Sequence, residues 1–266
     1  MTNDRTSQTR DYYNNSDREL GRRYLRDEYP EINREYIQAA TAHRFGLYPN
    51  QQRIADFSGA KDKKVLEVGV GQGLDHLQFA KAGARLSGVD LTPRHCQISR
   101  EVLRLEGYSS DIHEADACGL PFEDNQFDRV YSCGVLLLIS SIKDAIAEIH
   151  RVLKPGGHAT IMLYNRASLH YWIKSRFYHG YTLGEDKVLG KKIVDDWYTD
   201  GPGYVSVDYY APSDLPELFE QFSEIDYLTD CLTPEQIPFL GLPRVERIRR
   251  CLETRFGFFL WVRGTK

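Results

Sequence analysis

A glycine-rich turn is the first group of residues whose spacing could support chemistry. The run from Glu67 to Gly73, with glycines at every second position from Gly69, follows a β-branched segment and precedes a helical pattern. Glycines at such a turn let the backbone bend sharply and approach a ligand without a Cβ in the way. In a parallel sheet this turn lies at the edge where ligands bind. A purely structural turn is the alternative.

Two aspartates follow the next two expected strands. Asp90 ends the second strand, where a carboxylate can accept both hydroxyl protons of a ribose. It could instead cap the following helix, but Thr92, directly before Pro93, is the better cap. Asp116 follows the third strand and could accept a proton from an adenine amino group, or could be an ordinary surface aspartate. Together the motifs predict a site for an adenosine-containing ligand.

The glycine spacing discriminates between nucleotide classes. A dinucleotide fingerprint needs a third glycine where this chain has Leu74, and no P-loop lysine follows the turn. Asp90 would suit NAD and an adenosyl ligand equally. A nicotinamide-dependent oxidoreductase therefore stays the less favoured enzyme class.

Strands and helices alternate around these motifs, which predicts right-handed βαβ crossovers and a largely parallel sheet. The chain then ends with a helix and two strands. The expected strands are 64–68, 85–89, 111–114, 127–133, 158–164, 224–228 and 258–262, and the helices are 74–82, 93–105, 142–152 and 213–222.

The flanking segments differ in character from this core. Residues 1 to about 10 are polar and are expected to lack regular structure. A capping box predicts a helix starting at Ser16, and a second helix is expected from near Asn33 to Arg44. The sequence is divided into an amino-terminal helical cap (1–60), a cofactor-binding core (61–164), an aromatic-rich lid insertion (165–211) and a carboxyl-terminal part (212–266).

From Lys64 to Tyr164 the sequence resembles the class I S-adenosylmethionine-dependent methyltransferases, in particular the ubiquinone/menaquinone-biosynthesis-like group. The resemblance rests on residues 65–73, 88–90, 120–122, 127–128 and 151–157. It implies a Rossmann-like α/β fold with seven strands, the last antiparallel, and helices on both faces. It also implies S-adenosyl-L-methionine as cofactor, with the glycines on its amino acid portion. The implied cofactor-binding residues are Glu67, Gly69, Gly71, Gly73, Asp90, Leu91, Asp116, Ala117 and Cys133.

The catalytic and acceptor residues are less evident. After the fourth strand, where many relatives carry a His-His pair, this chain has residues 133–139 without an imidazole, and the motif used on nucleic-acid bases is missing. A sulfonium methyl is already activated, so alignment is the enzyme's main task. Candidate bases are Tyr13, Tyr164, His170 and His179, although packing or lid structure is the favoured interpretation for each tyrosine and a non-catalytic, hydrogen-bonded or exposed side chain for each histidine. Candidate acceptor or lid residues are Tyr12, Tyr13, Tyr164 and Arg166.

Composition and charge limit the kinds of partner that this protein is expected to bind. The net charge of −4 and the isoelectric point near 6.1 argue against a nucleic-acid-binding protein. No apolar run is long enough to cross a membrane, no signal peptide is evident, and the five scattered cysteines indicate reduced thiols and no metal site. We expect a cytoplasmic enzyme that methylates a small molecule, with a homodimer as its candidate assembly. The non-enzymatic alternative is a methyltransferase-like binding or regulatory protein.

Overall fold

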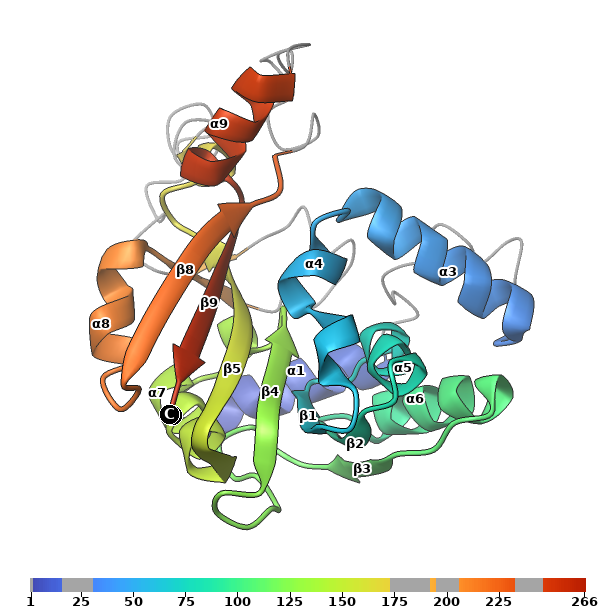
Figure 1. Cartoon of the computed structure of the whole chain (residues 1–266). Helices are drawn as coiled ribbons and strands as arrows, with labels where there is room; N and C mark the ends of the chain where they lie inside the picture. The colour runs from blue at the N-terminus through green and yellow to red at the C-terminus, as the bar shows by residue number, and fades with distance from the viewer. Residues whose placement is uncertain (1, 16–30, 173–191, 195–205, 233–245) are drawn as a thin grey trace.

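The computed structural model describes residues 2–15, 31–172, 192–194, 206–232 and 246–266 (Figure 1). Its centre is a mixed sheet in which five parallel strands run in the order β3-β2-β1-β4-β5. Strand β9 pairs antiparallel with β5, and β8 pairs antiparallel with β9. The strands are β1 (Lys64–Val68), β2 (Arg85–Asp90), β3 (Asp111–Glu114), β4 (Phe127–Cys133), β5 (Leu153–Asn165), β8 (Glu224–Asp230) and β9 (Phe259–Thr265). The predicted parallel sheet with an antiparallel last strand is confirmed.

Two further strands make the sheet larger than the seven strands that were expected. Strands β6 (Lys192–Val194) and β7 (Ser206–Tyr210) form an antiparallel pair within the segment interpreted as an insertion. Strand β7 pairs with β5 only at Tyr164 and Asn165, whereas β4 pairs with β5 as far as Met162. The insertion therefore places β7 beyond the carboxyl end of β4, at the edge of the sheet where the glycine turn lies.

Helices cover both faces of the sheet, as expected. Successive strand residues alternate between two apolar clusters, because neighbouring side chains of a strand point to opposite faces. Leu66 and Val68 pack with α7 and α8, whereas Val65 packs with α4 and α5. Helix α6 joins α3 and α5 in a third cluster. The helices are α3 (Arg34–Leu47), α4 (Gln51–Ala55), α5 (Leu74–Lys81), α6 (Pro93–Glu106), α7 (Ile142–Val152) and α8 (Leu215–Leu218).

Side-chain caps mark the beginning of α6 and α3, the two helices that matter most for the functional site. Thr92 Oγ1 accepts a hydrogen bond from His95 N at 3.3 Å, so Thr92 caps α6 as predicted. Asn33 Oδ1 accepts from Tyr36 N at 2.8 Å and caps α3. Each cap fixes the direction in which its helix leaves the edge of the sheet.

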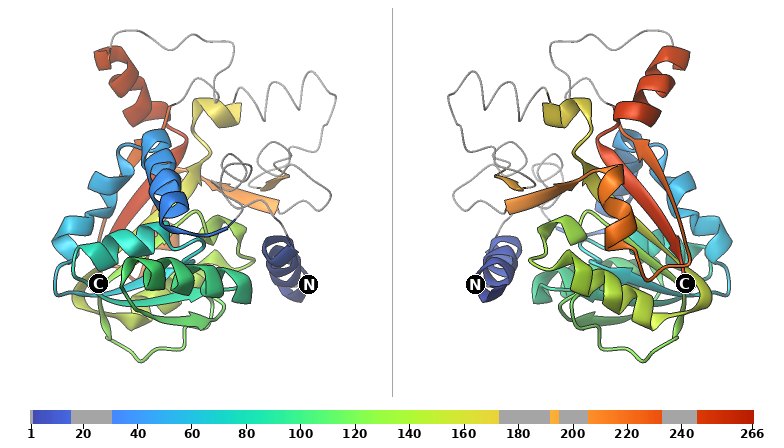
Figure 2. Two further views of the ribbon diagram at one scale, coloured as in Figure 1. Left: turned by 90° about the vertical axis from the view of Figure 1, so that its right-hand side faces the viewer. Right: turned by 90° about the vertical axis from the view of Figure 1, so that its left-hand side faces the viewer.

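The ends of the chain contain the main errors of the sequence prediction. Residues expected to lack regular structure form helix α1 (Thr2–Asn15), which lies beside the β6–β7 hairpin (Figure 2). Polar contacts to distant elements tether this polar helix: Arg5 pairs with Asp208 on β7, and Arg94 donates to Asn14 O. Because these partners lie far away in the sequence, no local pattern could have predicted this helix. The helix expected to start at Ser16 lies outside the described residues.

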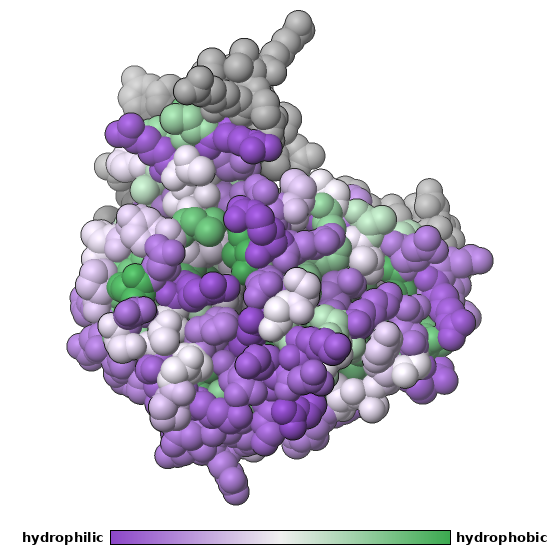
Figure 3. Space-filling view, in the orientation of Figure 1, coloured by the Kyte–Doolittle hydropathy of each residue, from purple (hydrophilic) through white to green (hydrophobic). Residues whose placement is uncertain are grey.

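Two carboxyl-terminal elements also differ from expectation. The helix expected over 213–222 is reduced to a 3-10 turn (Pro212–Asp214) followed by α8, and α9 (Glu246–Phe256) was not predicted. Strand β8 is well placed but largely exposed, and among the described strands it pairs only with β9. Figure 3 shows apolar patches over this region, where Ile225 and Leu228 are exposed aliphatic side chains.

Helix α7 provides a direct test of the packing. Ile149 faces the sheet with 0% exposure, whereas the Lys143 side chain on the same helix is 57% exposed. Ile149→Ala should lower the free energy of unfolding by about 2–5 kcal/mol through lost burial and a cavity. Lys143→Ala should change it by no more than about 0.5 kcal/mol. Equal effects in urea denaturation would contradict this packing.

Candidate functional site

A cavity of about 240 Å³ opens at the carboxyl edge of β1, β2 and β4. Its wall combines the glycine turn, the ends of three strands, and residues of α1 and α3. Every residue predicted to bind the cofactor, apart from Gly73, lines it: Glu67, Gly69, Gly71, Asp90, Leu91, Asp116, Ala117 and Cys133. The structure therefore brings together residues from four separate parts of the core.

The glycine turn owes its composition to backbone geometry. Gly69, Gly71 and Gly73 all have positive φ, at 84°, 50° and 76°. A Cβ on Gly73 would lie 2.9 Å from the Cα of Ser99 on α6, whereas a Cβ on Gly71 would meet nothing within 4 Å. Gly71 thus faces open space in the cavity, and Gly73 lets α5 approach α6 instead of lining the wall.

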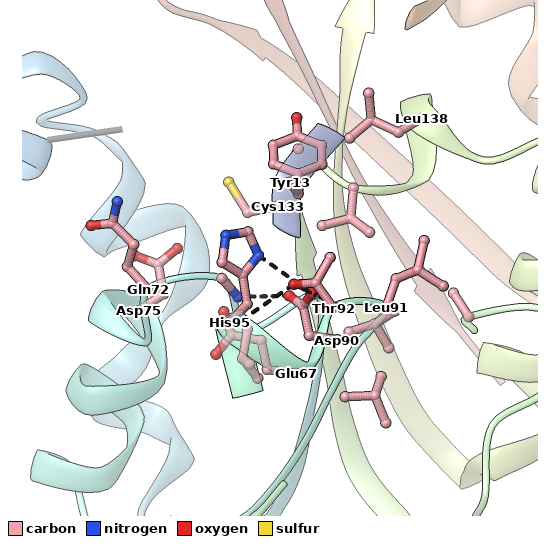
Figure 4. Close-up of a pocket in the computed structure, with 18 of the residues that line it drawn as sticks. Tyr13, Glu67, Gln72, Asp75, Asp90, Leu91, Thr92, His95, Cys133 and Leu138 are labelled. Atoms are coloured by element: carbon pink, nitrogen blue, oxygen red, sulfur yellow. Dashed lines mark hydrogen bonds and ion pairs between the residues drawn. The ribbon is translucent and has the colours of Figure 1, made fainter. Parts of the chain in front are cut away.

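Asp90 is held in place by donors on three sides. Its Oδ2 accepts from Gly71 N at 2.9 Å, and its Oδ1 accepts from Thr92 N at 3.0 Å and Thr92 Oγ1 at 2.9 Å. His95 Nδ1 lies 3.4 Å from Oδ1 (Figure 4). Burial alone raises the pKa of this carboxyl, but the hydrogen bonds from His95, Gly71 and Thr92 outweigh it and hold the pKa below its ordinary value. Asp90 is therefore an ionised acceptor at neutral pH.

His95 was missed by the sequence analysis. It lies in the first turn of α6, directly after the Thr92 cap, and its ring lies 5.7 Å from that of Tyr13. The sequence could have indicated His95. The helix cap, Thr92, follows Asp90 by only two residues, so a residue in the first turn of α6 must lie near the carboxyl end of β2.

A second buried carboxylate, Asp75, anchors the amino-terminal helices to the core. Arg44 on α3 binds it through two contacts, Nε to Oδ1 at 2.7 Å and a terminal guanidinium nitrogen to Oδ2 at 2.6 Å. Gln51 Nε2 donates to Oδ2 at 2.8 Å and Tyr131 Oη donates at 3.1 Å. Such two-pronged pairing fixes orientation as well as charge. None of these contacts was predicted.

Helix α1 covers part of the cavity. Thr6, Thr9 and Tyr13 line the wall, and these positions repeat at the spacing of one helix face. Tyr12 does not line the cavity but contacts the ring of Tyr13 edge-on at 5.1 Å. Burial raises the pKa of Tyr13 well above its ordinary value, so the phenol keeps its proton at neutral pH and no phenolate is present to act as a base.

Three other candidates, Tyr164 and Arg166 for the acceptor pocket and His170 as a base, do not line this cavity, and their roles stay predictions. The Tyr164 ring packs 4.4 Å from that of Phe258. Arg166 binds both carboxylate oxygens of Asp214, at 3.0 and 3.1 Å. His170 is 2% exposed and packs on Phe258. None lines the cavity, nor does any other described residue of the insertion, and His179 lies outside the described residues.

Two negative findings concern the described part of the chain. No cluster of three or more His, Cys, Asp or Glu side chains suited to a metal ion occurs among those residues. No helix in the same residues has the length and apolarity needed to cross a bilayer. All five cysteines are free thiols.

Comparison with known proteins agrees with this geometry. Residues 66–161 match the family described as a methyltransferase domain. The chain is 39% identical over 94 residues to a sterol 4-C-methyltransferase of Caenorhabditis elegans, a match covering 35% of this chain and 28% of that protein. It is 33% identical over 99 residues to a demethylmenaquinone methyltransferase of Tropheryma whipplei, covering 37% and 41%. The matches therefore span less than half of these relatives.

The fold is shared more widely than the sequence. A crystal structure of an S-adenosylmethionine-dependent methyltransferase from Mesorhizobium loti aligns with a TM-score of 0.57, at 15% identity, over 82% of this chain and 97% of that one. The expected Rossmann-like fold is confirmed, and residues 66–161 match the methyltransferase domain family.

The different surroundings of two glycines lead to a prediction. Gly71→Ala should cost about 1–2 kcal/mol of folding free energy, from the left-handed backbone alone. Gly73→Ala adds a contact with the α6 backbone, which typically costs a further 1–3 kcal/mol, roughly. Chemical denaturation should therefore rank Gly73→Ala as the less stable variant. The reverse order would contradict the packing of α5 against α6.

Proposed function

We propose that this protein transfers a methyl group from S-adenosylmethionine to a small-molecule acceptor. The observation that carries the proposal is the cavity, where an ionised Asp90 and a positive-φ glycine turn face the same space. An acceptor for ribose hydroxyls and a backbone that allows close approach are what an adenosyl ligand requires.

The residues that line the cavity suit each part of S-adenosylmethionine. Asp90 would accept the ribose hydroxyls, and Asp116 would lie near the adenine amino group with Leu91 and Ala117 as apolar surfaces. Gly69 and Gly71 would lie along the amino acid portion. Gln72 also lines the cavity, and its buried Nε2 has no hydrogen-bond partner among the described residues.

Catalysis would depend mainly on positioning. The cofactor supplies an activated methyl group, so the chain has to hold the acceptor in line with it. Such alignment can contribute about 7–11 kcal/mol. Because Tyr13 is a poor base, the imidazoles in the wall, His43 and His95, are the better candidates where an acceptor must lose a proton.

The acceptor is proposed to bind beneath α1. Leu47, Tyr48, Leu138 and Ile139 give this part of the wall an apolar character, and Thr6 and Thr9 add hydroxyl groups. This composition suits a small and partly apolar molecule. The cytoplasmic location, the homodimer and the division of the chain into four parts stay predictions.

Ligand-induced stabilisation tests the proposal. S-adenosylhomocysteine at about a hundred times its Kd should stabilise the protein by about 2.7 kcal/mol, which raises Tm by several degrees. NAD and NADP should have little effect. Asp90→Asn should weaken binding at least tenfold, since hydrogen bonds to a charged group contribute about 1.5–3 kcal/mol. A larger shift with NAD would instead support the oxidoreductase alternative, and binding without any methylated product in a metabolite extract would support a regulatory role.

Thr9 allows a test of whether α1, which covers part of the cavity, contacts the cofactor. Its Oγ1 is buried and has no hydrogen-bond partner in the described part of the chain, so Thr9→Val should not destabilise the free protein. The variant should bind S-adenosylhomocysteine several-fold more weakly if this hydroxyl contacts the cofactor. Thr41 has an equally buried, unpartnered hydroxyl but does not line the cavity, so Thr41→Val is the matched control. Equal affinities in calorimetry would exclude Thr9 from the cofactor site.

A further inference from the structure

A chain of hydrogen bonds leads from the cavity wall into the interior. Glu67 Oε2 lies 2.8 Å from His76 Nδ1, and His76 Nε2 lies 2.8 Å from Ser110 Oγ. Ser110 Oγ in turn lies 3.0 Å from Leu86 O. The side chains of His76 and Glu67 are only 0% and 4% exposed. No bulk water can therefore substitute for a missing donor or acceptor.

The direction of these bonds follows from their last member. A carbonyl oxygen only accepts, so Ser110 must donate its single hydroxyl hydrogen to Leu86 O. Ser110 Oγ consequently accepts from His76, which places a hydrogen on Nε2. In a neutral imidazole the other nitrogen, Nδ1, is then an acceptor. The hydrogen between Nδ1 and Glu67 must therefore belong to Glu67, unless the ring carries two protons.

A doubly protonated ring is disfavoured by its surroundings. Burial lowers the pKa of His76 to about 3. Burial likewise raises the pKa of Glu67 well above its ordinary value, and the nearby charges of Asp75 and Asp90 add to this, opposed by Arg44. These are the charged groups that face Glu67, together with His76 itself. Both effects leave the proton on the carboxyl group.

We propose that Glu67 is a protonated carboxylic acid in the free protein, and that it releases this proton when an ammonium group of the cofactor binds beside it. The inference rests on the proposed function for the identity of the ligand. On binding, the O–H bond of Glu67 breaks and its proton moves to His76 Nδ1, while the hydrogen on Nε2 passes to solvent beside the half-buried Ser110. The Ser110 hydroxyl then turns to donate to Nε2, and the carboxylate accepts from Nδ1–H and pairs with the ammonium, so that one proton is released in all. His76 and Ser110 are positioning residues that hold the carboxyl group in its protonated form.

The proposal makes cofactor affinity depend on pH. Each proton released on binding makes Kd fall about tenfold per pH unit, as long as the pH stays below the pKa of Glu67 in the free protein. The ammonium of the ligand remains protonated at about pH 6, because an α-amino group has a pKa of about 7.7–8.0. Measurements near pH 6 therefore isolate the protein's own proton.

Calorimetry of S-adenosylhomocysteine binding near pH 6, in two buffers with different heats of ionisation, counts the protons released. We expect close to one proton for the native protein. Glu67→Gln should release none, because its amide can donate to His76 Nδ1 but cannot ionise. Asp116→Asn removes another carboxylate from the same cavity and should leave the proton count unchanged. No release by the native protein, or equal release by Glu67→Gln, would overturn the proposal.

A second measurement needs no ligand. Because the glutamine amide replaces the protonated carboxyl group, Glu67→Gln should keep the native Tm to within about 2 °C, whereas Glu67→Ala should lower it further. If Glu67 were instead a carboxylate paired with an imidazolium, Glu67→Gln would leave a buried cation unpaired and would be as unstable as Glu67→Ala. Failure of S-adenosylhomocysteine to bind at all would contradict the proposed function and leave this stability result to decide the protonation state.

Discussion

The carboxylate of Asp75 accepts hydrogen bonds from three side chains that reach it from different elements, Arg44 from α3, Gln51 from α4 and Tyr131 from β4. Its own side chain is only 4% exposed, so loss of one partner would leave a charge or a polar group buried without compensation. Helices α3 and α4 precede the sheet in the chain, yet this contact fixes them against the glycine turn. The cavity therefore has a defined wall on that side.

Acidic side chains around the cavity share a common arrangement. Each of the three nearest the glycine turn has a basic partner: His76 for Glu67, Arg44 for Asp75 and His95 for Asp90. Two of the partners are imidazoles and one is a guanidinium, so the three pairs do not carry the same charge. The Asp75 pair is fixed by a guanidinium, whereas Asp90 is ionised chiefly through hydrogen bonds. A cationic ligand thus meets a site whose negative charge is concentrated on Asp90.

Features set by local patterns were predicted well. The bounds of β1, β3, β4 and α7 agree with the sequence analysis, because alternation, helical spacing and capping are recorded in neighbouring residues. The glycine turn and the strand ends also singled out Gly69, Gly71, Asp90 and Asp116, which line the cavity.

Features that depend on distant partners could not be predicted in this way. Arg44 reaches Asp75, and α1 reaches β7, through polar contacts between segments far apart in the chain. Tyr164 and His170 were singled out as candidates, and their rings pack on Phe258, a contact that the sequence pattern did not indicate. Aromatic residues can serve packing and recognition equally, and only the tertiary structure separates the two.

The exposed edge of β8 has a consequence for solubility. Among the described strands β8 pairs on one side only, and such an edge with aliphatic residues like Ile225 and Leu228 can template the addition of another strand. Glu224 and Asp226 lie on the same strand, and both are exposed. A second copy laid along this edge would have to desolvate these carboxylates without any basic residue on the strand to compensate them. The acidic side chains thus protect the sheet from edge-to-edge aggregation while leaving its last strand uncovered.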